Sequence, residues 1–408
     1  MKANPALLWK LRGLMFFQFS IWGTWYMTIG AYMAKMEMAD GIAWTYTVGP
    51  IAALISPFTV GMMADRLFQT QRMLSILFLL SAVFIGISPI VAGPGQASTF
   101  NTFIFLHMLC FMPTLGLTAS LCMTHLKEAA NDFPIVRVWG TLGWIFAASS
   151  ISLPFLGESE PYQLYLAAVY STLLAVAAWF LPATPAPKKG EPIKIQDLLF
   201  LDAWKLLTKL NFLIFMVSAF LICIPLAAFY VYLQPQMMAM GVESVGFYKS
   251  FGQWSEVIFM LLMPFFFRRL GVKKMLIIGM GAWALRYFLF YIGAQQNLFA
   301  LIMVGVILHG ICYDFFFVVG HIFVDQAAPK KIRAQAQSLF IFFTQGLGLA
   351  LGAKISEQLF KGTLGDWDKA VDASSLMLEW PNFWIALAIM AAIVTITFAL
   401  TFHHNEEK

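Results

Sequence analysis

Apolar stretches of about 20 residues recur along the whole chain, separated by short polar segments. A helix of that length crosses roughly 30 Å of hydrocarbon. The stretches lack the alternating apolar and polar positions of an outer-membrane barrel. Hydropathy therefore predicts about twelve membrane-spanning helices. Their approximate limits are 14–34, 42–64, 72–92, 101–123, 136–156, 163–182, 210–234, 246–267, 273–294, 297–322, 335–358 and 380–402.

The composition places these helices in a lipid bilayer. The 408 residues are 60% hydrophobic and only 12% charged, whereas soluble proteins carry about 25% charged residues. So few charged side chains cannot cover a surface that faces water. The sequence therefore predicts an all-α integral membrane protein.

Lysine and arginine are concentrated in alternate loops, which indicates the orientation of the chain. They precede the first span and follow spans two, six, eight and ten: Lys2, Lys10, Arg12, Arg66, Arg72, Lys188, Lys189, Lys194, Lys205, Lys209, Arg268, Arg269, Lys273, Lys274, Lys330, Lys331 and Arg333. The positive-inside rule then predicts that both termini are cytoplasmic. The net charge of +5 is thus a topology signal, and we expect no nucleic-acid partner.

The longest polar interval divides the spans into two sets of six. It predicts an N-terminal half at 1–182, a cytoplasmic linker at 183–209 and a C-terminal half at 210–408. Within the linker, 195–201 is expected to form an amphipathic helix on the membrane surface. Two six-helix halves describe the major facilitator fold, whose binding site lies between the halves near the bilayer midplane.

Ionisable residues inside the predicted spans indicate a functional interior. Glu256 and Asp314 lie deep in apolar runs, and Arg137 and Arg286 lie near or within spans. An ionisable side chain at that depth costs roughly 2.5–3.5 kcal/mol on insertion scales. Such residues persist when they serve a function or find a buried partner, so we infer a polar cavity through the bundle.

Span five carries the first candidate site. Arg137, Thr141 and Trp144 are spaced i, i+4, i+7 and share one helical face. They offer a fixed cation, a hydroxyl and a flat ring to a polar ligand with an aromatic part. The alternative is that Arg137 anchors the cytoplasmic end of the helix and Trp144 packs against neighbours.

Span eight carries the second candidate site. Gln253 and Glu256 are spaced i, i+3 on one face. Glu256 can bind a substrate hydroxyl when ionised, or hold a proton where burial disfavours its charge. The alternative is a structural ion pair between Glu256 and Arg286.

Spans ten and one add further candidates. His309 and Tyr313 are spaced i, i+4, while Asp314 points about 100° away from Tyr313. Asp314 is expected either to bind the coupled proton or to pair with a buried cation. Gln18 and Trp22 are also spaced i, i+4 and can reach a central cavity. The alternative is that the aromatic residues of span one belong to an interfacial belt.

Motifs for soluble chemistry are missing from the sequence. It has no Walker loop, dinucleotide fingerprint or metal-binding histidine pair. We therefore predict no enzyme activity, cofactor or metal. The expected energy source is an electrochemical gradient of protons, because carboxylates in a shielded cavity titrate.

Several segments of the sequence, taken together, resemble the nucleoside:proton symporter family of the major facilitator superfamily. The matching segments are 18–25, 111–117, 132–134, 137–141, 253–256, 283–286, 313–316 and 333–337. The resemblance implies substrate contacts at Arg137, Thr141 and Trp144. It also implies contacts at the four positions Gln253, Glu256, His309 and Tyr313, and a coupling role for Asp314.

The chain departs from the family pattern at four positions. Cys223 and Leu226 stand where polar amides are expected in span seven, His309 replaces a tyrosine and Trp144 a phenylalanine. These changes leave transport intact and put the identity of the substrate in question.

The prediction is a proton-coupled nucleoside importer that works by alternating access. We place it in a bacterial inner membrane and expect a monomer to be functional. A sugar or glycoside:proton symporter of the same fold is the alternative substrate class. A receptor that binds without flux is a different class, and the sequence shows no sizeable soluble signalling domain to support it.

Overall fold

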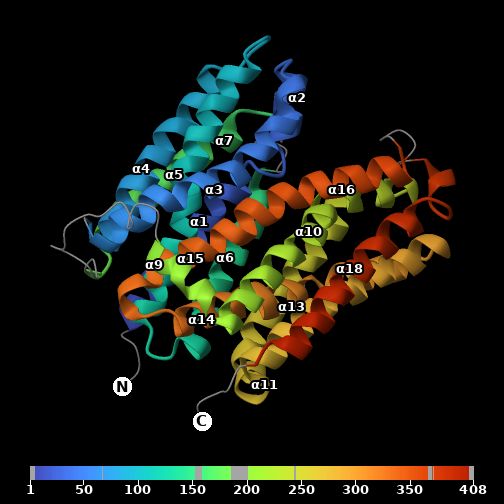
Figure 1. Ribbon diagram of the computed structural model, residues 1–408. Helices are drawn as coiled ribbons and strands as arrows, with labels where there is room; N and C mark the ends of the chain where they lie inside the picture. The colour runs from blue at the N-terminus through green and yellow to red at the C-terminus, as the bar shows by residue number, and fades with distance from the viewer. Residues whose placement is uncertain are drawn as a thin grey trace. The chain divides into compact units, whose positions relative to one another are not determined.

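The computed structural model describes residues 5–66, 68–151, 159–184, 201–242, 245–365, 370 and 372–403, and these contain helices but no strands. They belong to two compact units (Figure 1). The first is Met1–Leu206 with Val324–Phe342, and the second is Leu207–Phe323 with Phe343–Lys408. The amphipathic helix predicted at 195–201 lies, except for its last residue, outside the described part. The predicted limits of the two halves stay a prediction.

Helices of the first unit pack along their length, α4 against α5 and α7, and α1 against α6. Its elements are α1 (Pro5–Gly23), α2 (Ile29–Lys35), α3 (Ile42–Arg66), α4 (Thr70–Ile87), α5 (Ala97–His125), α6 (Ala129–Ile151), α7 (Tyr162–Trp179), α9 (Leu201–Trp204) and α15 (Arg333–Ile341).

The second unit is built in the same way, with α11 packed against α12, α13 and α18, and α10 against α16. Its helices are α10 (Leu210–Ala239), α11 (Val245–Gln295), α12 (Phe299–Ile307), α13 (His309–Tyr313), α16 (Leu349–Thr363) and α18 (Trp380–Thr401). A π-helical segment, Asp314–Val318, joins α13 to α14 (Val319–Ala327), and another, Phe342–Gly348, precedes α16.

The helices account for the spans predicted from hydropathy. Among the described residues, eight helices are long and apolar enough to cross a membrane. One of them, α11, contains two predicted spans that meet at a bend at Gly271, where φ is 65°. Predicted spans one, two and five fall on α1, α3 and α6. The prediction of an all-α bundle of about twelve spans is confirmed.

Helix ends differ from the predicted limits where charged residues lower the local hydropathy. The first helix begins at Pro5, about nine residues before the predicted span. Lys10 donates a hydrogen bond to the carbonyl of Phe180 at 3.1 Å, and Arg12 lies 4.9 Å from the centre of the Trp9 ring. Charged side chains with such partners at a helix end do not stop the helix.

Span five likewise begins earlier than predicted. Helix α6 starts at Ala129, so Arg137 lies about two turns inside it. The position of Arg137 therefore gives no support to a role as an anchor at the helix end.

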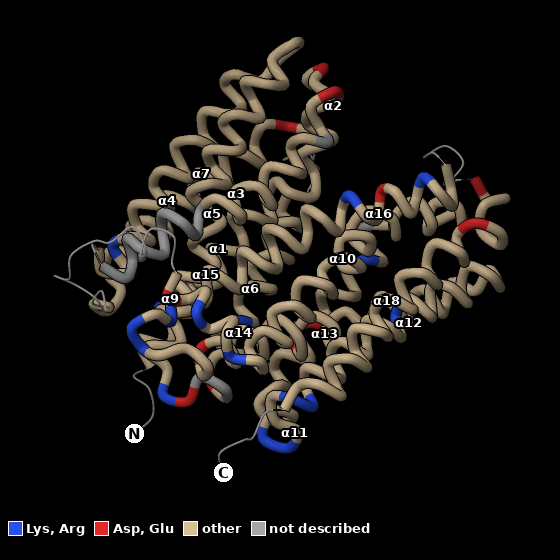
Figure 2. Tube along the Cα trace, viewed as in Figure 1, with Lys and Arg blue, Asp and Glu red and all other residues tan. Residues whose placement is uncertain are grey.

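Charged residues are concentrated at helix ends in each unit (Figure 2). In the second unit, Arg268, Arg269, Lys273 and Lys274 flank the bend of α11. The long helical stretches between such ends are almost free of charge, as expected for segments that pass through lipid.

Close contact between α1 and α6 depends on a glycine. A methyl group placed on Gly143 would lie 2.1 Å from the carbonyl oxygen of Phe16. The hydroxyl of Ser20 crosses the same contact and donates to the carbonyl of Gly143 at 3.1 Å. Small residues at such contacts let helices approach in a membrane, where packing and hydrogen bonds hold them together.

We predict that Gly143→Ala destabilises the protein by roughly 1–3 kcal/mol, because the added methyl overlaps a backbone atom that cannot rotate away. Thermal unfolding in detergent measures this loss of stability. Gly13→Ala on α1 is the control, since no atom lies within 4 Å of its added methyl. An unchanged melting temperature for Gly143→Ala would show that the two helices are not held this closely.

Candidate substrate and proton site

Gln18 is fixed by a hydrogen bond between two helices of the first unit. Its side chain is 1% exposed, and its Nε2 donates to Thr114 Oγ1 on α5 at 2.9 Å. Thr114 Oγ1 in turn donates to the carbonyl of Phe111 at 2.5 Å. Within the described residues, Gln18 Oε1 has no hydrogen-bond partner. This oxygen is an acceptor held in a fixed place.

Trp144 belongs to an aromatic cluster with α1. Its ring meets Trp22 edge to face at 5.7 Å and Tyr26 at 6.3 Å, and these two rings lie 5.4 Å apart. Edge-to-face contacts leave ring faces available for stacking. Trp22 therefore contacts Trp144, one of the predicted site residues.

Arg137 lies over an aromatic ring in the first unit. Its guanidinium carbon is 3.9 Å from the centre of the Phe19 ring. The side chain is 8% exposed, and its Nη1 has no hydrogen-bond partner among the described residues. A cation–π contact orients the group without satisfying its N–H donors. Arg137 can therefore still donate to a ligand carbonyl or hydroxyl.

Thr141 lies one turn further along α6 and is 4% exposed. The side chains of Arg137, Thr141 and Trp144 share a helical face, as predicted, but Arg137 and Trp144 contact different aromatic residues of α1.

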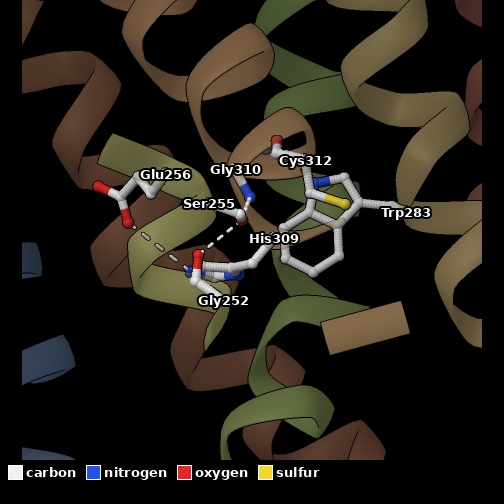
Figure 3. Close-up of polar contacts among 7 residues, drawn as sticks. All are labelled: Gly252, Ser255, Glu256, Trp283, His309, Gly310 and Cys312. Carbon is white, nitrogen blue, oxygen red and sulfur yellow. Dashed lines mark hydrogen bonds and ion pairs between the residues drawn. The ribbon is translucent and has the colours of Figure 1, made fainter. Parts of the chain in front are cut away.

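In the second unit, α11 and α13 bring Glu256 and His309 together (Figure 3). Glu256 Oε2 lies 3.9 Å from His309 Nε2, and both side chains are more than nine-tenths buried. The imidazole stacks on Phe229 of α10 at 5.4 Å with an interplanar angle of 20°. Tyr313 lies 5.7 Å from the same imidazole. Three of the predicted site residues therefore form one cluster.

A second contact fixes the backbone beneath this cluster (Figure 3). Ser255 Oγ accepts a hydrogen bond from the Gly310 amide at 2.9 Å and donates to the Gly252 carbonyl at 2.8 Å. A methyl group on Gly310 would lie 2.5 Å from the Ser255 carbonyl oxygen. The glycine therefore allows α11 and α13 to touch next to Glu256 and His309.

Gln253 and Asp314 occupy different environments. Gln253 is half-buried one turn before Glu256. Asp314 is fully buried and opens the π-helical segment Asp314–Val318. Such segments inside α-helices often occur at functional sites, which agrees with a special role for this carboxylate.

Arg286 does not form the ion pair considered from the sequence. In the described part of the chain, no carboxylate oxygen lies within 4 Å of its guanidinium. Its Nε donates to the Gly305 carbonyl at 2.9 Å, and its guanidinium carbon lies 4.2 Å from the Phe229 ring and 4.7 Å from the Trp283 ring. Aromatic rings therefore take the place of the expected acid.

Three residues of these clusters were absent from the predicted site. Thr114 lies in the segment 111–117 and Ser255 lies between Gln253 and Glu256, so nearby motifs carry a signal for both. Phe229 is one aromatic residue in an apolar span, and nothing in its sequence context sets it apart.

The described residues include no group of three or more histidine, cysteine, aspartate or glutamate side chains that could hold a metal ion. The groups in these two clusters can bind a polar ligand, stack on a ring and exchange protons. Buried polar clusters inside apolar helices are typical of a membrane transporter.

Solved structures give the class of the fold. The proton:xylose symporter XylE of the major facilitator superfamily superposes with a TM-score of 0.72 at 10% identity, covering 98% of this chain and 97% of XylE. The nucleoside transporter NupG superposes with a TM-score of 0.68 at 27% identity, covering 98% of this chain and all of NupG. The chain therefore has the major facilitator fold.

The sequence comparisons give the family. The profile of the nucleoside H+ symporter family matches residues 6–407. The chain is 34% identical to YegT of Escherichia coli (strain K12), over 98% of this chain and 94% of YegT. It is 30% identical to the xanthosine permease of the same organism, over 98% and 97% of the two chains. The chain belongs to the nucleoside H+ symporter family and is a multi-pass membrane transporter, not an enzyme.

We predict that Ser255→Ala lowers stability by roughly 1–3 kcal/mol, because it leaves the buried Gly310 amide without its acceptor. Ser250→Ala is a matched control on the same helix, since among the described residues the Ser250 hydroxyl donates to the Phe247 carbonyl three residues earlier and to no other helix. Melting temperatures of the two variants in detergent provide the comparison. Equal shifts would mean that the contact between α11 and α13 does not depend on Ser255.

Proposed function

We propose that the protein imports nucleosides together with protons by alternating access. The match of the whole chain to the nucleoside H+ symporter family carries this proposal. We place the protein in a bacterial inner membrane on the basis of its family. The distribution of lysine and arginine supports a cytoplasmic location of both termini. A monomer is expected to suffice, because the site residues come from one chain.

The two clusters supply the groups that a nucleoside requires. The base would stack on Trp144 or Tyr313, and Arg137 would donate to a base carbonyl or to the ribose. Ribose hydroxyls would bond Gln253 and Glu256. Gln18 Oε1, which has no described partner, adds an acceptor for a base amino group. Thr141 adds a hydroxyl on the same face as Arg137.

Proton coupling would rest on Glu256 and Asp314. Both carboxylates are more than nine-tenths buried, and burial disfavours the charged form of a carboxylate. Binding a proton would neutralise the group and favour the loaded carrier that reorients across the membrane. The proton is the coupled ion, and we expect no cofactor because the proton gradient would supply the energy.

A sugar or glycoside:proton symporter remains the second candidate. Cys223 and Leu226 of α10 are 0% and 1% exposed. Neither side chain can donate and accept hydrogen bonds as an amide does. The second unit therefore offers a nucleobase fewer polar contacts than the family pattern implies.

We predict that proteoliposomes accumulate labelled uridine, adenosine or xanthosine against a gradient when protons flow inward. Collapse of the proton gradient should abolish accumulation. Competition by unlabelled ribose and disaccharides tests the second candidate. If a folded preparation takes up no nucleoside and a sugar competes for its binding site, the nucleoside proposal is wrong.

We predict that Glu256→Gln abolishes uphill accumulation, because the amide keeps hydrogen-bonding capacity but cannot exchange the proton. Exchange of labelled for unlabelled nucleoside across the membrane, which needs no net proton movement, should persist at reduced affinity. Glu357→Gln is the control, since Glu357 pairs with Lys354 and Lys361 on α16. Accumulation by Glu256→Gln at the normal level would remove Glu256 from the coupling mechanism.

A further inference from the structure

The separation between Glu256 and His309 suits a bridging group. At 3.9 Å, Glu256 Oε2 and His309 Nε2 are too far apart for a direct hydrogen bond. An oxygen placed about 2.7 Å from the carboxylate and about 2.9 Å from the imidazole would subtend an angle of about 90° between them. That angle is about 20° below the tetrahedral value, and a hydroxyl oxygen tolerates such a deviation because hydrogen-bond directions are broadly distributed.

The surrounding structure fixes the imidazole and the backbones of the two helices. The imidazole is held by stacking on Phe229 at 5.4 Å. The backbones of α11 and α13 are held by the bond from the Gly310 amide to Ser255. A methyl group on Gly252 would lie 3.1 Å from His309 Cβ, so the helices already meet at this level. The two side chains cannot close the gap by a movement of the helices.

The chemistry of the pair selects one kind of ligand group. A carboxylate only accepts hydrogen bonds, and it favours the imidazole tautomer that carries its proton on the facing Nε2. Among the described residues, His309 Nδ1 has no hydrogen-bond partner, so nothing opposes this tautomer. A bridging group must donate to Glu256 and accept from His309. A hydroxyl does both, whereas a carbonyl only accepts and an exocyclic amino group of a base only donates.

We infer that Glu256 and His309 together bind one hydroxyl of the ribose 2′,3′-diol, which makes the carrier selective for ribonucleosides over deoxyribonucleosides. This inference rests on the proposed function and assigns His309 the role of a specificity-determining hydrogen-bond donor. The pair keeps a small exposed fraction, 7% for Glu256 and 6% for His309.

The test compares binding of uridine and adenosine with that of their 2′-deoxy and 3′-deoxy forms. The full-length protein is used in detergent, and affinity is measured by titration calorimetry. We expect one of the two deoxy forms to bind about 10- to 100-fold more weakly, because it loses the hydrogen bonds of this hydroxyl with Glu256 and His309. The form that loses affinity identifies the hydroxyl.

Two variants of His309 separate a role in recognising the substrate hydroxyl from a role in stabilising the protein. His309→Phe keeps an aromatic ring on Phe229 but removes the donor, so the discrimination against the affected deoxy form should fall several-fold, while Glu256 can still accept from the hydroxyl. His309→Gln places an amide donor near the position of Nε2 and should retain part of the discrimination. Ser250→Ala should discriminate as the unaltered protein does.

The possible results distinguish this inference from the proposed function. If the ribonucleoside and both deoxy forms bind the unaltered protein equally, the inference is wrong while nucleoside binding stands. Unchanged discrimination in His309→Phe also overturns it. If neither uridine nor adenosine binds, both the proposed function and the inference fail. The comparison in the unaltered protein decides the question even if His309→Phe does not fold.

Discussion

Hydrocarbon offers no hydrogen-bond partner, so the polar groups of these helices depend on other parts of the protein for theirs. Gln18 of α1 donates a hydrogen bond to Thr114 of α5, and the Gly310 amide of α13 donates one to Ser255 of α11. Both contacts require helices that approach closely, and Gly310 permits the second approach. The polar interior and the tight packing are therefore consequences of the same constraint, and each site cluster lies beside such a contact.

The fold was largely predictable because the length of an apolar run is a local property of the sequence. Each predicted span is helical over most of its length, including the two that meet at Gly271, although the first crosses a turn between α1 and α2. Helix ends were less predictable, since a helix continues where hydropathy falls if its side chains find partners. The early start of α6 at Ala129 matters most, because it moves Arg137 from the expected end of a helix to its interior.

The candidate site was predictable only within single helices. Spacing identifies residues that share a face, and it grouped His309 with Tyr313 correctly. Spacing carries no information about partners on other helices. Charge alone suggested that Arg286 is the ion-pair partner of Glu256. The structure instead brings His309 to Glu256 and places Arg286 on aromatic rings. A cation can be stabilised by ring faces as well as by an acid, so a count of opposite charges could not decide between these arrangements.

The pair of Glu256 and His309 joins recognition and coupling at one position. When Glu256 is ionised it accepts from a hydroxyl, and when it is protonated its carbonyl oxygen can still accept. A ligand hydroxyl and a coupled proton would therefore act on the same carboxylate. His309 supplies the donor for the hydroxyl, whereas Glu256 would also bind the coupled proton. Since Cys223 and Leu226 provide no amide on α10, this pair would carry a larger share of substrate selection than in relatives that retain the amides. The two side chains can thus be assigned separate roles although they lie 3.9 Å apart.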